Sequence, residues 1–131
     1  MATIEKFEDV LAWQKGRELT QNIYRHSRRG EFAKDFALRD QMRRAAISIT
    51  SNIAEGFERG GNKEFIQFLS HSKGSCGEVR SQLYVALDES YLTDDEFTEL
   101  YELCLEIGRL LDGFTNYLQR TEIKGRKFMN R

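Results

Sequence analysis

The sequence of 131 residues contains no proline. Proline removes a backbone donor and clashes with the preceding turn inside a helix, whereas turn-rich β architectures use it freely. Its absence therefore favours long, uninterrupted helices. The sequence also lacks an apolar run that approaches about 20 residues, the length that spans a bilayer. Its first residues do not show the basic segment followed by an apolar segment that is typical of a signal peptide. We expect neither membrane insertion nor export.

Cysteine is scarce, because Cys76 and Cys104 are the only two in the sequence. Two cysteines are too few for a disulfide framework, and both fall on the apolar stripes of expected helices, where a thiol acts as a small hydrophobic group. This usage fits a reducing compartment, and we predict a cytoplasmic protein. The length suits one domain, which needs no metal or disulfide to remain folded.

Histidine is equally rare, with only His26 and His71. Di-iron bundles need Glu-x-x-His pairs, but Ile23 and Phe68 stand three residues before these histidines. His71 and Cys76 lie about 140° apart around a helix, which disfavours a shared zinc site. The sequence also lacks a P-loop, a dinucleotide-binding fingerprint and a zinc-protease motif. We predict a protein that is not an enzyme and uses no cofactor, metal or small-molecule substrate.

Apolar residues recur at steps of three and four in four segments. They predict helices at about residues 8–28, 35–59, 62–91 and 94–121. A mean spacing near 3.5 residues selects nearly aligned packing at about 20°, and short connections make consecutive helices antiparallel. We predict an all-α, antiparallel up-down-up-down four-helix bundle over residues 1–121, followed by a basic, flexible tail at 122–131.

Local signals place the ends of these helices. The first helix is expected to end near Gly30, and residues 31–34 are expected to form a loop. Asp35 and Asn62 are the predicted N-caps of the second and third helices. Residues 93–96, Thr-Asp-Asp-Glu, have the form of a capping box for the fourth helix.

A second apolar row flanks the main stripe of the last two helices. It comprises Tyr84 and Tyr91 in the third helix and Leu103, Leu110 and Tyr117 in the fourth. Apolar flanks favour subunit contacts, since soluble monomers rarely expose large apolar patches. The alternative is a broader core within one chain. We favour self-association.

A stripe of polar residues lies beside the apolar one in the second and third helices. It contains Gln41, Arg44, Ser48, Asn52, Glu55, Ser75 and Glu78. One interpretation is a binding groove or a reactive pocket, which would make the protein an enzyme or a small-ligand binder. The other is a hydrogen-bonded network that sets the helix register, with Arg44 paired to Glu55 or Glu78. We favour the structural network.

Charge is distributed unevenly, although the net charge is only −1. Residues 61–121 carry 5 Lys and Arg against 11 Asp and Glu, whereas residues 122–131 carry 4 against 1. The basic residues that could contact successive phosphates of a nucleic acid are Arg25, Arg28, Arg29, Arg39, Arg43, Lys124, Arg126 and Lys127. Nearby acidic residues dilute these clusters, and the sequence shows no aromatic-rich platform for a single strand.

The second helix contains the string Arg-Ala-Ala-x-Ser-Ile-x-x-Asn-Ile-Ala-Glu-Gly, which ends at Gly56. Trp13-Gln14 precedes it, and Phe65, Phe68-Leu69, Gly74-Ser75 and Glu78 follow it. Over about residues 7–118 this pattern resembles the bacterial four-helix-bundle family named for proteins encoded in intervening sequences of 23S ribosomal RNA genes. The polar stripe belongs to the matching positions and is more easily interpreted as a signature of this fold than as a ligand site.

The resemblance implies an up-down four-helix bundle that assembles as a ring-like homopentamer. It also implies a link to the accessory proteins of diversity-generating retroelements, which bind a reverse transcriptase and nucleic acid through basic surfaces. This chain differs from those strongly basic proteins in being slightly acidic. The resulting hypothesis is a non-enzymatic, self-associating scaffold or adaptor whose partner is RNA or an RNA-handling protein such as a reverse transcriptase.

Overall fold

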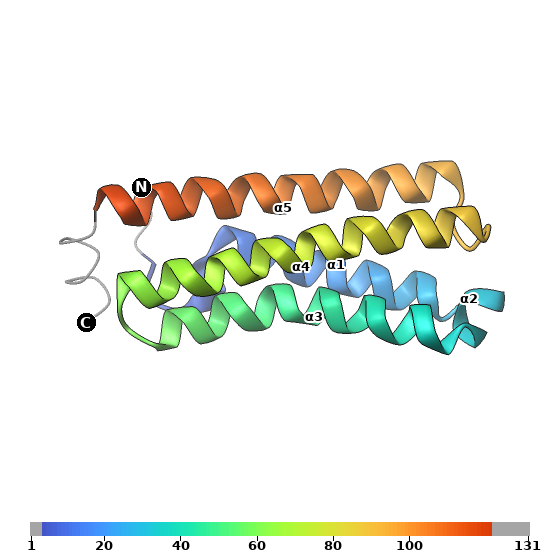
Figure 1. Cartoon of the computed structure of the whole chain (residues 1–131), viewed down its shortest axis with the longest axis horizontal. Coiled ribbons are helices and arrows are strands. Elements are labelled where there is room, and N and C mark those ends of the chain that lie inside the picture. Colours follow the sequence, from blue (N-terminus) through green and yellow to red (C-terminus); the bar gives the residue numbers. More distant parts are fainter. Residues whose placement is uncertain (1–3, 122–131) are drawn as a thin grey trace.

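The computed structural model describes residues 4–121, and this part of the chain is helical and contains no β-strand. Its elements are the 3-10 helix η1 (Phe7–Asp9) and the α-helices α1 (Leu11–Ser27), α2 (Gly30–Lys34), α3 (Phe36–Glu58), α4 (Asn62–Asp88) and α5 (Asp94–Arg120). The four long helices run along a common axis, and short connections join them at the ends of the bundle (Figure 1). The predicted antiparallel four-helix bundle is confirmed.

The core lies along the axis of the bundle, where each long helix buries one apolar stripe. Helix α3 packs on α4, α4 packs on α5, and α1 contacts both α3 and α5. The stripes predicted for the third and fourth helices face this core and are at most 3% exposed at Cys76, Val79, Ile107 and Leu111. Burial of such side chains is the main favourable contribution to folding, at about 1.5–3 kcal/mol for each large one.

Two of the three predicted caps are present. The Leu38 amide donates a hydrogen bond of 3.1 Å to Oδ1 of Asp35 at the start of α3. At the start of α5, the Glu96 amide donates to the Thr93 hydroxyl, and the Thr93 amide donates to the Glu96 carboxylate. These short-range bonds satisfy backbone donors that lack a partner inside the helix.

The prediction that Asn62 caps α4 is wrong. Gly61 occupies the cap position without a side-chain bond, and Asn62 is the first residue of the helix. The Asn62 amide instead donates a hydrogen bond of 3.1 Å to the backbone oxygen of Leu118, near the end of α5. The Asn62 side chain therefore bonds to a distant segment of the chain instead of capping its own helix.

The expected loop at residues 31–34 is also wrong, because this segment forms α2. Helix α1 ends at Ser27, and Gly30, with φ of 47°, permits the sharp break before α2. Phe32 is 2% exposed and stacks on the ring of Tyr91 with centroids 5.0 Å apart. Burial of Phe32 stabilises a single helical turn that the short sequence pattern did not reveal.

The flanking apolar row lies mostly against the chain's own core. Leu103 is 8% exposed, and Leu110, Tyr117 and Tyr91 are partly buried against the core cluster. Tyr84 differs, since it is 50% exposed. The broader core that we considered as an alternative accounts for four of these five side chains, and Tyr84 is left on the surface.

Candidate nucleic-acid interface

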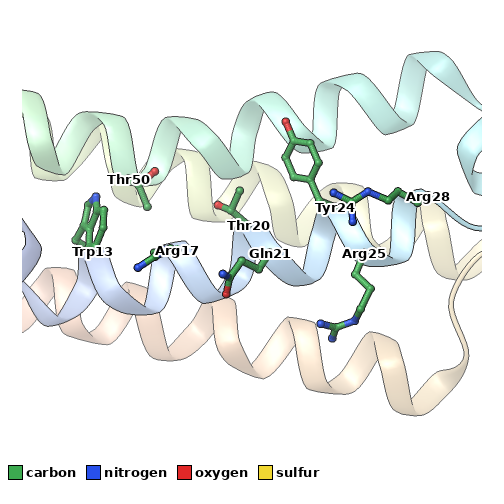
Figure 2. A pocket seen from close by; sticks show the side chains of 8 residues that line it. All are labelled: Trp13, Arg17, Thr20, Gln21, Tyr24, Arg25, Arg28 and Thr50. Carbon is green, nitrogen blue, oxygen red and sulfur yellow. The ribbon is translucent and has the colours of Figure 1, made fainter.

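A groove of about 650 Å³ runs along α1 beside α3. Its lining residues come from α1 except for Thr50, which belongs to α3 (Figure 2). They are Trp13, Arg17, Thr20, Gln21, Tyr24, Arg25, Arg28 and Thr50. The groove thus combines two aromatic rings, three guanidinium groups and a few small polar groups.

The regular repeat of α1 brings the aromatic and cationic groups together. Trp13 and Tyr24 are eleven residues apart, which corresponds to about three helical turns and places them on one face. Each ring is followed four residues later by an arginine. The guanidinium of Arg17 lies 6.0 Å from the Trp13 ring centroid, and that of Arg28 lies 5.9 Å from the Tyr24 centroid. The pairs form two similar units along the groove.

Helix α3 supports the second of these units. The guanidinium of Arg43 lies 4.5 Å from the Tyr24 ring centroid, and its Nε donates a hydrogen bond of 2.9 Å to the buried hydroxyl of Ser27. Arg43 therefore holds the Tyr24 ring in place rather than projecting freely. The close approach of the two helices depends on Gly16, because a Cβ there would lie 2.9 Å from Cγ2 of Thr50.

The groove carries three arginines, which give it positive charge. Arg17, Arg25 and Arg28 are exposed, and none of them forms an ion pair with a carboxylate between residues 4 and 121. Arg25 donates a hydrogen bond of 2.6 Å to the neutral side chain of Asn22. Such guanidinium groups attract anions and bind phosphate oxygens well.

Other arginines predicted to contact nucleic acid are engaged within the chain. Arg29 donates two hydrogen bonds to the Glu96 carboxylate, and this contact, together with the Thr93 amide, lowers the pKa of Glu96 to about 2. Arg39 donates to Asp40 and to the backbone oxygen of Ala33, both at 2.9 Å, and lowers the pKa of the Asp40 carboxyl. The remaining candidates lie outside the described residues: Lys124, Arg126 and Lys127.

Of the predicted nucleic-acid residues that lie within 4–121, Arg25 and Arg28 line the groove, and Arg43 supports it from α3. Sequence reasoning missed Arg17, Trp13 and Tyr24. The available signal was the spacing, since an aromatic residue followed four positions later by arginine occurs twice with an offset of eleven. Steps of three and four residues are equally typical of a core-facing stripe, so this spacing alone does not separate a groove from a core.

Part of the predicted polar network forms where α3 meets α4. The amide of Asn52 donates to the Ser48 hydroxyl at 2.9 Å, and the Ser75 hydroxyl on α4 donates to the same Ser48 oxygen at 2.9 Å. The buried hydroxyl of Ser72 donates to the backbone oxygen of Ile49 at 2.8 Å. These bonds couple the two helices and satisfy polar groups in a half-buried setting.

The rest of the stripe is on the surface. Gln41, Arg44 and Glu78 are exposed and line a shallow hollow of about 410 Å³. Glu55 forms an ion pair of 2.9 Å with Arg59, the C-cap residue of α3. The predicted pairing of Arg44 with Glu55 or Glu78 is therefore wrong for both carboxylates, since Arg44 has no ion pair within residues 4–121. The stripe is therefore a small interhelical network with exposed charged ends.

A smaller cleft of about 190 Å³ lies between α4 and α5 and contains both cysteines. Cys76 and Cys104 are free thiols that are 3% and 1% exposed. Burial raises the pKa of each thiol to about 12.

Among residues 4–121, no three His, Cys, Asp or Glu side chains gather as a metal site. None of the helices in the same range combines the length and apolar character needed to cross a bilayer.

The matched segment of the chain is long enough to establish its family. The sequence model of the 23S rRNA-intervening sequence protein family matches residues 8–113, which include every residue that lines the α1 groove. The chain belongs to this family. A search of curated proteins returns no match to this family member.

A solved structure supports the fold of this chain. It is the crystal structure of a protein of unknown function from the S23 ribosomal protein family of Bacteroides thetaiotaomicron VPI-5482. The two share 22% sequence identity with a TM-score of 0.72, over 80% of this chain and 98% of the other. At this level of identity the likeness establishes the helical bundle and not the activity.

Proposed function

We propose that this protein is a non-enzymatic, self-associating helical scaffold that binds RNA through the α1 groove. The observation that carries the proposal is the set of three exposed arginines that line the groove without carboxylate partners in the described range. Arg17 and Arg28 lie beside its two aromatic rings, and Arg25 extends toward α5 (Figure 2). The two buried, unreactive thiols suit a reducing cytoplasm. The family name links related proteins to ribosomal RNA genes and is compatible with an RNA partner.

The polar hollow near Arg44 supports a small-ligand site less well. Ser48, which lines the hollow, already accepts hydrogen bonds from the Ser75 hydroxyl and the Asn52 amide. A ligand would have to break these bonds to reach the Ser48 hydroxyl. In the α1 groove, the arginine side chains form no ion pairs within the described residues that a ligand would have to break. The groove therefore suits an anionic chain better than the hollow suits a small ligand.

RNA binding is tested by fluorescence anisotropy with a labelled RNA at about 50 and 200 mM salt. Neutralising three phosphates predicts a slope of log affinity against log salt of about −2. The triple variant Arg17→Gln, Arg25→Gln, Arg28→Gln should lose most of this slope and most of the affinity. A matched variant with the same charge change uses three exposed cations outside the groove: Lys63→Gln, Arg109→Gln and Arg120→Gln. Equal losses in both variants would refute a site in the groove.

Self-association rests on the surface of α4 and α5. Tyr84 is 50% exposed and Val85 is 45% exposed, and the Tyr84 ring lies 5.0 Å from Phe97 and 5.8 Å from Tyr101. An aromatic surface of this kind is typical of protein interfaces. A homopentamer, as the family resemblance implies, would present five copies of the groove. Sedimentation velocity at micromolar concentration should show an oligomer, and a monomer would contradict this part of the proposal.

A further inference from the structure

We propose that the α1 groove selects unpaired RNA over duplex RNA, with bases stacked on Trp13 and Tyr24 and phosphates held by the neighbouring arginines. This inference rests on the proposed RNA-binding function and adds that the bound RNA is unpaired. It follows from the aromatic rings of the groove, because arginines alone would bind either form.

The chemistry of the groove distinguishes the two forms. A duplex keeps its bases stacked inside and presents phosphates and sugars, so it gains little from the aromatic rings of the groove. An unpaired strand offers the faces of its bases, which stack on aromatic side chains with little dependence on sequence. Trp13 and Tyr24 both line the groove, and arginines lie between and beside them. This alternation matches the alternation of base and phosphate along a single strand.

The distances along α1 agree with a short stretch of strand. Eleven residues separate Trp13 from Tyr24, which at 1.5 Å per residue is roughly 16 Å. A stacked strand advances about 3.4 Å per nucleotide, so the groove covers about five nucleotides between the two rings. Single-strand sites of other small folds span about 4–16 nucleotides. Gln21, which is exposed midway along the groove, offers an amide to a base edge.

Trp13 and Tyr24 are both half-buried and line the groove, so each presents part of its ring there. Tyr24 is fixed by Arg43, which lies 4.5 Å away and is anchored to Ser27. Arg28 and Arg17 lie at 5.9 and 6.0 Å from their rings, close to the outer limit of a cation–π contact. A base can replace either of these two guanidinium groups on its ring and free it to bind a phosphate.

The test compares a 12-nucleotide RNA with the same RNA annealed to its complement, using the full chain at one low ionic strength. Trp13 is the only tryptophan of the sequence, so its fluorescence reports directly on stacking in the groove. We expect the single strand to bind at least about tenfold more tightly than the duplex and to quench Trp13. Tyr24→Leu should lower affinity for the single strand about tenfold and leave affinity for the duplex unchanged, whereas Tyr24→Phe should retain both.

Phe36→Leu is the control, since it removes an exposed aromatic ring from α3 outside the groove and should not change RNA affinity. Circular dichroism establishes that each variant is folded. Equal affinities for the two RNA forms, with Trp13 unquenched and Tyr24→Leu without effect, would overturn the inference and leave RNA binding intact. If neither RNA binds at low salt, the proposed function fails as well.

Discussion

The guanidinium of Arg29 donates two hydrogen bonds of 2.9 and 3.0 Å to the Glu96 carboxylate, which lies 67 positions further along the chain. The contact joins the connection between α1 and α2 to the first turn of α5. Nδ1 of His26 lies 3.7 Å from the same carboxylate, and burial, with the nearby Arg29 charge, lowers the pKa of this imidazole. At neutral pH the ion pair is therefore carried by Arg29.

This contact predicts a loss of stability in acid. The pKa of Glu96 falls from 4.5 to about 2 on folding, so its contribution is fully present above about pH 4.5 and disappears as the pH falls toward 2. Because the pair is partly exposed, we expect Glu96→Gln to cost only about 1 kcal/mol at pH 7. Urea unfolding between pH 7 and 2 should show the wild type and variant converging at the acidic end. Glu102→Gln, on the exposed surface of α5, is the control and should run parallel to the wild type.

The hydroxyl pair of Ser48 and Ser75 predicts an energetic coupling between α3 and α4. A double-mutant cycle with Ser48→Ala and Ser75→Ala should give a coupling of about 0.5–1.5 kcal/mol in the free energy of unfolding, because the bond is lost in either single variant. The exposed serines Ser51 and Ser81 supply a control cycle with no expected coupling. A coupling of zero in the Ser48 and Ser75 cycle would show that the hydroxyls are bonded to water instead.

Gly56 and Gly74 should respond in opposite ways to substitution by alanine. A Cβ at Gly56 would lie 2.7 Å from Cβ of Phe68 and 2.9 Å from Cδ1 of Phe65, so Gly56→Ala should cost about 1–3 kcal/mol. No atom lies within 4 Å of a Cβ at Gly74, where alanine should stabilise the exposed face of α4 by up to about 1 kcal/mol. Thermal unfolding of both variants measures the contrast, and destabilisation by both would contradict the close approach at Gly56.

The cysteines should be inert in the folded protein. Their burial and pKa values of about 12 leave very little thiolate at pH 8, so reaction of Cys76 and Cys104 with a disulfide reagent should be about a thousandfold slower than in urea. Ser81→Cys places a thiol on the exposed face of α4 and should react at once. Rapid reaction of the wild type would mean that the cleft between α4 and α5 opens.

The helical architecture was predictable because its causes are local and periodic. The three- and four-residue steps of apolar side chains predict the buried stripes, and the caps at Asp35 and Thr93 involve partners within three residues. The predictions that were wrong are those in which a contact with a distant segment determines the local structure. Asn62 bonds Leu118, and Phe32 is buried against Tyr91, which stabilises a helical turn in place of a loop.

The sequence alone determined that the chain forms four long helices, because regular spacing without proline leaves the backbone no better way to bury its apolar side chains. Only the tertiary structure decided which arginines are available to a partner. Arg29 and Arg39 are engaged by carboxylates, whereas Arg17, Arg25 and Arg28 have none within the described range. Whether a surface charge is neutralised depends on which side chains the packing of helices places within hydrogen-bonding distance, and for Arg29 that partner is 67 residues away.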